Sequence, residues 1–285
     1  MAKNFRQELV GVFGYPVDEN PTVVIQDAAF EAKGLFWHYL TLLVKPEDLQ
    51  DAMQSVRALN FKGINLTIPH KVACIPFLDK VDKSASLIGA VNTVKNEGGR
   101  LIGYNTDGQG FVRALTEENV SLKDATVALL GAGGAARSIA VESALAGAKK
   151  MYIINRNEQR GQTLAALISD NTACEAVYLK WETAARIPPD AGILVNATSV
   201  GLYPDTGLPD IDMSCITDKL VVCDGVHNPP RTPFLKKAAQ LGAAKTISGQ
   251  GMLVYQGAIG FEIWTGEKAP VDVMLAALQQ AFSEQ

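Results

Sequence analysis

Short apolar runs alternate with amphipathic stretches along the first hundred residues. The runs at 9–15, 40–44 and 63–68 are short and apolar, as buried strands are. Residues 23–33 predict a helix between the first two runs. Pro46, followed by two acidic residues, predicts the start of another helix, because Pro fits the first turn and acids favour the positive end of the helix dipole. This alternation is the pattern of an α/β layer structure.

The pattern changes after this region. Two apolar runs at 91–94 and 101–104 flank the Gly98-Gly99 pair, which predicts a hairpin, and a helix is predicted next at 108–117. Later strands are predicted at 126–130, 151–155, 192–196 and 220–224, and two C-terminal helices at 250–265 and 271–283. Because helical stretches separate these later strands, they predict a second α/β domain with a parallel sheet.

Composition narrows the class of protein without identifying it. The chain has 285 residues, of which 47% are hydrophobic and 20% charged, so it is long enough for one or two domains with a buried core. A net charge of −4 offers no basic surface for nucleic acid. No apolar run reaches the roughly 18 residues of a membrane span, and residues 1–8 lack the apolar segment of a signal peptide. We therefore expect a cytoplasmic monomer or homodimer with neither a nucleic-acid nor a membrane partner.

The cysteines give no sign of a metal site. The four of them, Cys74, Cys174, Cys215 and Cys223, are widely spaced along the chain. No pair has the C-x-x-C spacing of a zinc or redox site. We expect them to be small buried residues, and we expect no metal.

A glycine-rich turn directly follows the predicted strand at 126–130. Gly131 would make the tight turn, Gly133 would let backbone N–H groups approach a pyrophosphate, and Ala136 would permit close packing of a helix on the strand. The N-terminus of that helix supplies partial positive charge to the phosphates. Strand, turn and helix in this order predict a nucleotide site built on Gly131, Gly133, Gly134 and Ala135.

The end of the next strand indicates which dinucleotide binds. An acid there would accept hydrogen bonds from the ribose 2′-OH of NAD and would repel a 2′-phosphate. Here the strand ends in Asn155-Arg156-Asn157, and Arg160 follows one helical turn later. Guanidinium groups are suited to clamping a phosphate. We therefore predict NADP as the cofactor, bound in part by Asn155, Arg156 and Arg160, with NAD as the less favoured alternative.

Five short polar motifs accompany the glycine turn, in order along the chain. They are Asn65-Leu66-Thr67-Ile68-Pro69-His70-Lys71, Gly89-Ala90-Val91-Asn92-Thr93, Asn105-Thr106-Asp107-Gly108, Asn196-Ala197-Thr198-Ser199-Val200-Gly201 and Gly251-Met252-Leu253. Any one of them could recur by chance, whereas six motifs in register, with the glycine turn included, are a specific signal. The set closely resembles the shikimate dehydrogenase family, including its quinate/shikimate and shikimate dehydrogenase-like branches, over nearly the whole chain.

The resemblance implies an α/β fold with two domains. An N-terminal α/β substrate domain, completed by the C-terminal helices, would hold a Rossmann-like NADP-binding domain between its two parts. The seams are expected near Gly108 and Gln250. Residues 1–108 and 250–285 would then form the substrate-binding catalytic domain, and residues 109–249 the NADP-binding domain.

The resemblance also implies a reaction, the reversible hydride transfer between 3-dehydroshikimate and shikimate. Lys71 and Asp107 occupy the positions of the family's catalytic pair. A lysine near a carboxylate can act as a general acid/base while the carboxylate holds both the lysine and the substrate hydroxyl in place. The ring hydroxyls would be bound by Asn65, Thr67, Asn92, Asp107 and Gln256. On the cofactor side the family positions add Thr198, Val226, Gly249 and Met252, with Met252 beside the nicotinamide.

The substrate side departs from the family pattern near the N-terminus. The family usually carries Gly-x-Pro-x-x-x-Ser-x-Ser-Pro-x-x-His-Asn there, and its two serines hold the substrate carboxylate. This chain has Asn20 and Thr22 in place of the serines and Gln26-Asp27 in place of His-Asn. Asn20 and Thr22 are still expected to bind substrate, since both donate hydrogen bonds, but both are bulkier than Ser.

Two further departures involve charge and titration. Asp18 and Glu19 place negative charge near a site meant for an anion, which should weaken carboxylate binding unless they point away. The family's Asp-x-Val-Tyr-Asn-Pro is altered at residues 224–229, where His227 replaces Tyr. His227 is either a group that titrates near neutral pH or a plain polar replacement.

Three functional hypotheses remain. In the first, the protein is an NADP-dependent dehydrogenase of the shikimate type, and the departures leave open whether it prefers shikimate, quinate or another natural substrate. In the second, it is a ligand-sensing relative without activity, against which the retained Lys71 and Asp107 argue, as does the absence of an appended DNA-binding segment. In the third, it is an unrelated Rossmann oxidoreductase such as a methylenetetrahydrofolate dehydrogenase, against which Asn105-Thr106-Asp107-Gly108 argues.

Overall fold

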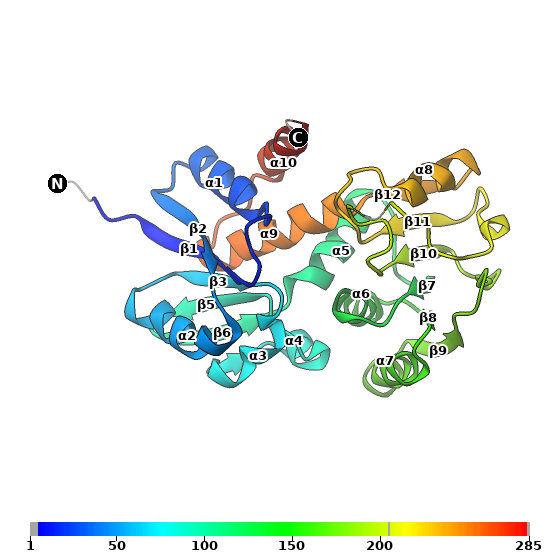
Figure 1. The fold of residues 1–285 in the computed structure, drawn as a ribbon, viewed down its shortest axis with the longest axis horizontal. Helices are drawn as coiled ribbons and strands as arrows, with labels where there is room; N and C mark the ends of the chain where they lie inside the picture. Colours follow the sequence, from blue (N-terminus) through cyan, green and yellow to red (C-terminus); the bar gives the residue numbers. More distant parts are fainter. Residues whose placement is uncertain (1–4, 205, 284–285) are drawn as a thin grey trace. The chain divides into compact units, whose positions relative to one another are not determined.

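The computed structural model describes residues 5–204 and 206–283, which divide into two compact units (Figure 1). Unit 1 contains the residues up to Thr106 together with those from Val254 onward, and unit 2 contains Asp107–Leu253. Each unit is built around its own six-stranded sheet. The α/β fold class predicted from the sequence is confirmed.

The sheet of unit 1 has the strand order β2-β1-β3-β5-β6-β4. Its strands are β1 (Glu8–Gly14), β2 (Trp37–Leu43), β3 (Gly63–Leu66), β4 (Lys80–Val81), β5 (Thr93–Glu97) and β6 (Arg100–Tyr104). Strand β1 runs parallel to β2 and β3, whereas β5 runs antiparallel to both β3 and β6. The predicted hairpin is therefore confirmed as β5–β6, and Gly98 and Gly99 adopt the positive φ angles that its turn requires.

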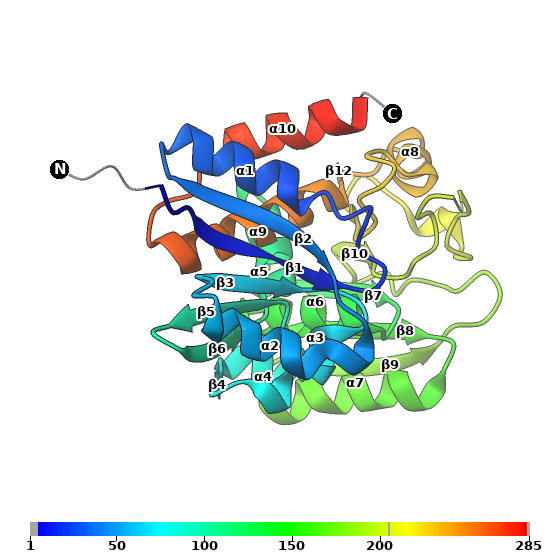
Figure 2. The same ribbon diagram turned by 60° about the vertical axis from the view of Figure 1, so that its left-hand side comes forward.

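Helices cover this sheet and complete unit 1. They are α1 (Thr22–Ala32), α2 (Leu49–Ala58), α3 (His70–Ala73), α4 (Lys83–Ile88), α9 (Gly249–Thr265) and α10 (Val271–Ser283), with short 3₁₀ turns at Pro46–Asp48 and Ile75–Phe77. Figures 1 and 2 show α10 lying beside α1, so the C-terminal segment packs on the N-terminal half of the chain. Phe13, Met53, Ile64 and Leu101 belong to a buried cluster that joins α2 to the sheet.

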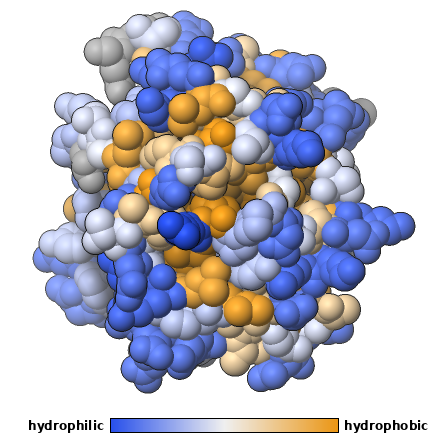
Figure 3. All heavy atoms as spheres, turned by 90° about the vertical axis from the view of Figure 1, so that its right-hand side faces the viewer, coloured by the Kyte–Doolittle hydropathy of each residue, from blue (hydrophilic) through white to orange (hydrophobic). Residues whose placement is uncertain are grey.

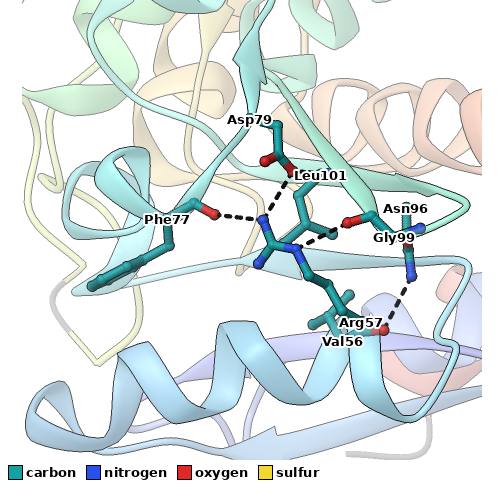
Figure 4. A network of polar contacts seen from close by, with 7 residues as sticks. All are labelled: Val56, Arg57, Phe77, Asp79, Asn96, Gly99 and Leu101. Atoms are coloured by element: carbon teal, nitrogen blue, oxygen red, sulfur yellow. Dashed lines mark hydrogen bonds and ion pairs between the residues drawn. The ribbon is translucent and has the colours of Figure 1, made fainter.

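A polar network centred on Arg57 ties α2 to the edge of the unit 1 sheet (Figure 4). The guanidinium donates to the carbonyl oxygens of Gly99 at 2.9 Å and Phe77 at 3.2 Å, and to the carboxylate of Asp79 at 2.9 Å. Asp79 also accepts from the backbone N–H of Leu101 at 2.6 Å. This backbone hydrogen bond and Arg57 lower the pKa of Asp79. The network links residues that are distant in sequence.

The sheet of unit 2 has the strand order β12-β11-β10-β7-β8-β9, and all of its strands are parallel. The strands are β7 (Thr126–Leu130), β8 (Lys150–Asn155), β9 (Glu175–Lys180), β10 (Ile193–Asn196), β11 (Val221–Asp224) and β12 (Lys245–Ile247). The order reverses between β7 and β10. In open parallel sheets of this kind, ligands bind outside the carboxyl ends of the strands at such a switch point.

The helices of unit 2 are α5 (Thr106–Glu117), α6 (Gly134–Leu145), α7 (Glu158–Asn171) and α8 (Pro233–Gln240), with a 3₁₀ turn at Met213–Cys215. Figure 1 shows α7 beside β8 and β9, and α8 beside β11 and β12. On the face of unit 2 that is turned to the viewer in Figure 3, apolar side chains gather at the centre and hydrophilic side chains surround them. No helix in the described ranges is both long and apolar enough to cross a bilayer.

Candidate substrate and cofactor sites

The glycine turn of unit 2 has the geometry that a dinucleotide site requires. Gly131 directly follows β7 with φ +107°, where a Cβ would lie 3.1 Å from the Thr198 side chain and 3.2 Å from the Ala197 oxygen. Only glycine fits there without strain. Gly133 is the N-cap residue of α6, and Ala136 is fully buried against the sheet. The strand, turn and helix are therefore arranged as predicted.

The first turn of α6, directly after this glycine turn, is exposed. Gly133, Gly134 and Ala135 are exposed, and a Cβ on either glycine would meet no atom within 4 Å. The N–H groups at a helix N-terminus have no partner within the helix. An anion placed here would meet both these donors and the positive end of the α6 dipole, so the turn fits a pyrophosphate.

The end of β8 carries the predicted phosphate clamp. The Arg156 guanidinium carbon lies 5.3 Å from the centroid of the Trp181 ring, a cation–π contact. Asn155 donates to the Asn157 carbonyl at 2.7 Å, and the Asn157 side chain caps α7 by accepting from the Arg160 N–H at 2.9 Å. Arg156 is exposed just after β8, where a 2′-phosphate is expected.

The buried carboxylate of Asp224 accepts hydrogen bonds from residues at and beyond the carboxyl ends of β10 and β11. Asp224 accepts from the Asn196 side chain at 2.9 Å, from the Val226 N–H at 3.0 Å and from the Thr232 hydroxyl at 2.6 Å. Asn196 in turn accepts from the Thr198 hydroxyl at 2.7 Å. Burial raises the pKa of Asp224 to about 6 despite the hydrogen bonds that favour its charged form.

This carboxylate cluster holds two of the predicted cofactor residues, Thr198 and Val226. Asn196, Asp224 and Thr232 were not predicted as members of the site. The signal that could have found them is that two neighbouring buried strands both end in a polar residue, Asn196 and Asp224.

The remaining predicted cofactor residues lie at the start of α9. Gly249 is its first residue, and a Cβ there would lie 2.4 Å from the Val226 carbonyl oxygen, so glycine allows the two backbones to approach. Met252 follows in the first turn of α9 and is partly buried. Burial lowers the pKa of His227, which favours its neutral form.

Three of the substrate residues predicted in unit 1 lie in a buried network of uncharged side chains. Asn65 on β3 accepts from the Tyr39 hydroxyl at 2.7 Å and donates to the Thr93 hydroxyl at 2.9 Å. Asn92 donates to the Thr106 hydroxyl at 3.0 Å, and its amide nitrogen lies 3.4 Å from the Gln256 side-chain oxygen. The structure thus brings together three of the predicted substrate residues, Asn65, Asn92 and Gln256. It adds Tyr39, and also Thr93 and Thr106, which stand in the polar motifs but were not predicted to bind substrate.

The N-terminus of α1 carries the two residues that replace the family's serines. The Asn20 side-chain oxygen accepts from the Thr22 N–H at 3.0 Å, and Thr22 is buried. The Thr22 hydroxyl is hydrogen-bonded to Tyr39, which connects it to the network around Asn65. Burial raises the pKa of Tyr39 well above its usual value, so its hydroxyl keeps its proton.

The predicted catalytic pair is divided between the units. Lys71 lies on α3 of unit 1, where its carbonyl accepts from the Val91 N–H at 2.7 Å. Asp107 lies in the first turn of α5 and is the first residue of unit 2. Thr67 lies between β3 and α3, and its N–H donates to the Phe13 carbonyl at 3.0 Å. The pairing of Lys71 with Asp107 stays a prediction.

No metal ligand set accompanies these sites. Within residues 5–204 and 206–283, no three His, Cys, Asp or Glu side chains are grouped so that they could hold a metal ion. The four cysteines are free thiols. Burial raises the pKa of Cys74 to about 12, so this thiol is protonated at neutral pH.

Three family models match successive parts of the chain. The shikimate dehydrogenase substrate binding domain matches residues 12–94, the shikimate / quinate 5-dehydrogenase model matches residues 114–202, and the shikimate 5′-dehydrogenase C-terminal domain matches residues 249–279. The matched segments follow one another along both units.

Individual proteins resemble the chain over almost its whole length. The shikimate dehydrogenase (NADP(+)) of Desulforamulus reducens is 41% identical over 99% of this chain and 98% of its own. A crystal structure of a shikimate dehydrogenase in complex with NADP+ superposes with a TM-score of 0.92 at 38% identity, covering 98% of this chain and 97% of that one. The ligand-free 5-ketofructose reductase of Gluconobacter sp. strain CHM43 gives a TM-score of 0.95 at 44% identity, covering 98% of this chain and all of that one.

Proposed function

Because this chain belongs to the shikimate dehydrogenase family, we propose that it is an NADP-dependent oxidoreductase that interconverts 3-dehydroshikimate and shikimate. The observation that carries this proposal is the 41% identity, over nearly the whole of both chains, to a shikimate dehydrogenase that uses NADP(+). The open glycine turn before α6 and the exposed Arg156 give that cofactor a fitting surface in this chain.

The proposed NADP site uses the carboxyl ends of the unit 2 strands. The N–H groups at the start of α6 bind the pyrophosphate, and Arg156 binds the 2′-phosphate, supported by Asn155 and Arg160. Thr198, Val226, Gly249 and Met252 line the nicotinamide end. When bound, NADP accepts a hydride in one direction and NADPH donates it in the other. The residues of the chain position the cofactor and select its phosphate.

The proposed substrate site uses unit 1 together with Asp107. Oxidation removes a hydride from the alcohol carbon and a proton from its hydroxyl, and in the proposal Lys71 takes that proton while Asp107 orients the hydroxyl. Asn65, Thr67, Asn92 and Gln256 bind the other ring hydroxyls, and Asn20 and Thr22 bind the far side of the ring. Residues 1–108 and 250–285 would act as the substrate domain and residues 109–249 as the NADP domain.

A second candidate reaction is the reduction of an uncharged ketose. The observation that favours it is the likeness to the 5-ketofructose reductase of Gluconobacter, which is 44% identical to this chain. That protein's named substrate has no carboxylate, and this chain lacks the serine pair that holds one in the family. Both candidates use the same cofactor and the same transfer of a hydride to a ring or chain ketone.

One assay tests the function and separates the two candidates. NADPH consumption is followed by absorbance with 3-dehydroshikimate and with 5-ketofructose, and NADP reduction is followed with shikimate and quinate. Turnover of 3-dehydroshikimate supports the first candidate, and turnover of 5-ketofructose alone supports the second. Binding of shikimate without turnover of any of the four compounds would favour the ligand-sensing relative instead.

We further propose that the protein works in the cytoplasm as a monomer or homodimer. The free thiols support the cytoplasmic location, because disulfides are rare in reducing compartments. Light scattering after size-exclusion chromatography measures the oligomeric state. A trimer or larger assembly would contradict the proposal.

A further inference from the structure

The substrate end of unit 1 contains a continuous network of neutral polar groups. Its members are Thr22, Tyr39, Asn65, Asn92, Thr93, Thr106 and Gln256, all of them buried. None of these side chains carries a charge at neutral pH. What the network can offer a ligand therefore depends on which of its donors and acceptors are already used by the protein itself.

Asn65 has used its donors. Its side-chain nitrogen donates both to the Asn92 carbonyl at 3.0 Å and to the Thr93 hydroxyl at 2.9 Å, which accounts for both amide hydrogens. Its oxygen accepts one hydrogen bond, from the Tyr39 hydroxyl at 2.7 Å. An amide oxygen has two lone pairs. Toward a ligand, Asn65 is therefore an acceptor.

Thr22 has also used its only donor. The Tyr39 hydroxyl donates its hydrogen to the Asn65 side-chain oxygen. In the hydrogen bond between Thr22 and Tyr39, the donor is therefore Thr22. The one hydroxyl proton of Thr22 is then used inside the protein. The family's second serine is thus replaced by a hydroxyl that has no proton left for a carboxylate.

Gln26 adds an unmatched acceptor one turn further along α1. Residues four apart on a helix share a face, so Gln26 follows Thr22 on the buried side of α1. The side chain is fully buried, and its nitrogen donates to the Gly257 carbonyl at 2.8 Å. Its oxygen is buried with no hydrogen-bond partner among the described residues. A buried acceptor without a partner is unfavourable, so α1 adds no donor for a carboxylate at this position.

We propose that this end of the substrate site recognises hydroxyl or other donor groups and disfavours a carboxylate, so that of the two candidate substrate classes the uncharged polyol ketone is preferred. The inference rests on the proposed NADP-dependent oxidoreduction at this site, since it chooses between the two candidate substrates of that reaction. A carboxylate only accepts hydrogen bonds and is expensive to bury without donors or a cation. A hydroxyl donates to an acceptor such as the Asn65 oxygen, and it can accept from the Asn20 nitrogen in return.

The charges beside this network also disfavour a carboxylate. Asp18 and Glu19 precede Asn20 in the chain and are exposed. Their negative charge opposes a carboxylate at the N-terminus of α1 and has little effect on a neutral hydroxyl. Lys71 is the cation expected in unit 1, and the proposal places it at the reacting carbon and not at the carboxylate.

A matched pair of substrates tests the inference directly. Shikimate and its carboxamide have nearly the same shape, but the carboxamide is neutral and carries two N–H donors. We expect kcat/KM with NADP to be at least tenfold higher for the carboxamide than for shikimate. Any smaller ratio, or a preference for shikimate, overturns the inference.

Calorimetry separates this result from failure of the proposed function. If neither compound is oxidised and NADP does not bind, the proposed function fails. If NADP binds without turnover, the affinities of the two compounds for the NADP complex still measure the preference. We expect the carboxamide to bind at least tenfold more tightly, and equal or weaker binding overturns the inference.

A variant that restores the family's pair checks that these residues set the preference. Asn20→Ser combined with Thr22→Ser supplies two small hydroxyl donors, and we expect it to shift the ratio at least tenfold toward shikimate. The matched control is Thr116→Ser on α5, whose hydroxyl donates to the Val112 carbonyl outside the network and whose ratio should stay at the wild-type value. An unchanged ratio in a folded double variant would overturn the assignment to Asn20 and Thr22.

Discussion

Unit 2 presents its expected ligand groups largely through the backbone, whereas unit 1 presents side chains. In unit 2 the glycine turn at Gly131 and the start of α6 expose N–H groups, and their geometry follows from the strand, turn and helix alone. In unit 1 the groups at the proposed substrate site are the amides and hydroxyls of Tyr39, Asn65 and their neighbours. The two proposed sites are therefore expected to respond differently to sequence change.

A backbone site persists as long as the fold and a few glycines persist. A side-chain site changes with single substitutions, because each replaced residue alters the set of donors and acceptors. This difference explains why the cofactor side keeps the family's pattern while Asn20, Thr22 and Gln26 depart from it. It also predicts that variants in the two units will affect different measurements.

The largest effect is expected from Lys71→Ala in unit 1. Loss of the proposed general acid/base should lower kcat by about 10³-fold, within the usual range for such groups. The melting temperature and the affinity for NADP should stay near the wild-type values, since Lys71 is expected to act on substrate alone. A variant that retained wild-type kcat would remove Lys71 from the mechanism.

Asp224→Asn is expected to change how stability depends on pH. Burial raises the pKa of Asp224 from 3.8 to about 6, so between these values the folded state binds more protons than the unfolded state. The contribution of Asp224 to stability is thus fully present below pH 4 and is lost as pH rises through 6, by up to about 3 kcal/mol. The Asn variant has no such proton to release. Urea unfolding from pH 4 to pH 7 should show a flatter profile for it, and parallel profiles would refute the assignment.

Arg156→Gln tests the cofactor side of the comparison. Removal of the guanidinium over Trp181 should raise KM for NADP by about tenfold or more, because a charge-assisted contact with phosphate is worth about 1.5–3 kcal/mol. KM for substrate and for NAD should change little. Arg186→Gln, on the exposed surface outside the proposed site, serves as the control. Equal losses with NAD and NADP would show that Arg156 does not read the 2′-phosphate.

Gly131→Ala should have the smallest effect of the four. Its φ of +107° and the tight space beside Thr198 strain any side chain, at a cost of about 1–2 kcal/mol in unfolding free energy. Gly192→Ala is the matched control, since a Cβ there meets no atom within 4 Å and its φ is not positive. The comparison is measured by urea unfolding. Equal stability of the two variants would mean that the turn relaxes around the new methyl group.

Much of the fold could be predicted from local sequence. The hairpin at β5–β6, the glycine turn and the C-terminal helices follow from turn residues and apolar periodicity. Strands β9 and β12 could not be found in this way. Strand β9 is only partly buried, which weakens its pattern, and β12 has three residues that include Lys245. Strand β2 begins at Trp37, three residues before the predicted run.

The site was predictable only where a motif marks it. Asn65 and Asn92 stand in recognisable motifs, whereas Tyr39 looks like any aromatic residue of a strand. Gln26 bonds to Gly257, which lies 231 residues further along the chain. Such contacts depend on how distant elements pack, and a single sequence carries no local signal for them.

Both covalent links between the two units run through helices. The division falls in the first turn of α5, at Thr106 and Asp107, and again inside α9, at Leu253 and Val254. Proteases cut exposed, irregular segments more readily than helical backbone. Limited digestion is therefore not expected to release either unit as an intact fragment. A gene fragment that encodes one unit alone would end within a helical turn and leave backbone groups unsatisfied, so the chain is expected to be produced and handled only as a whole.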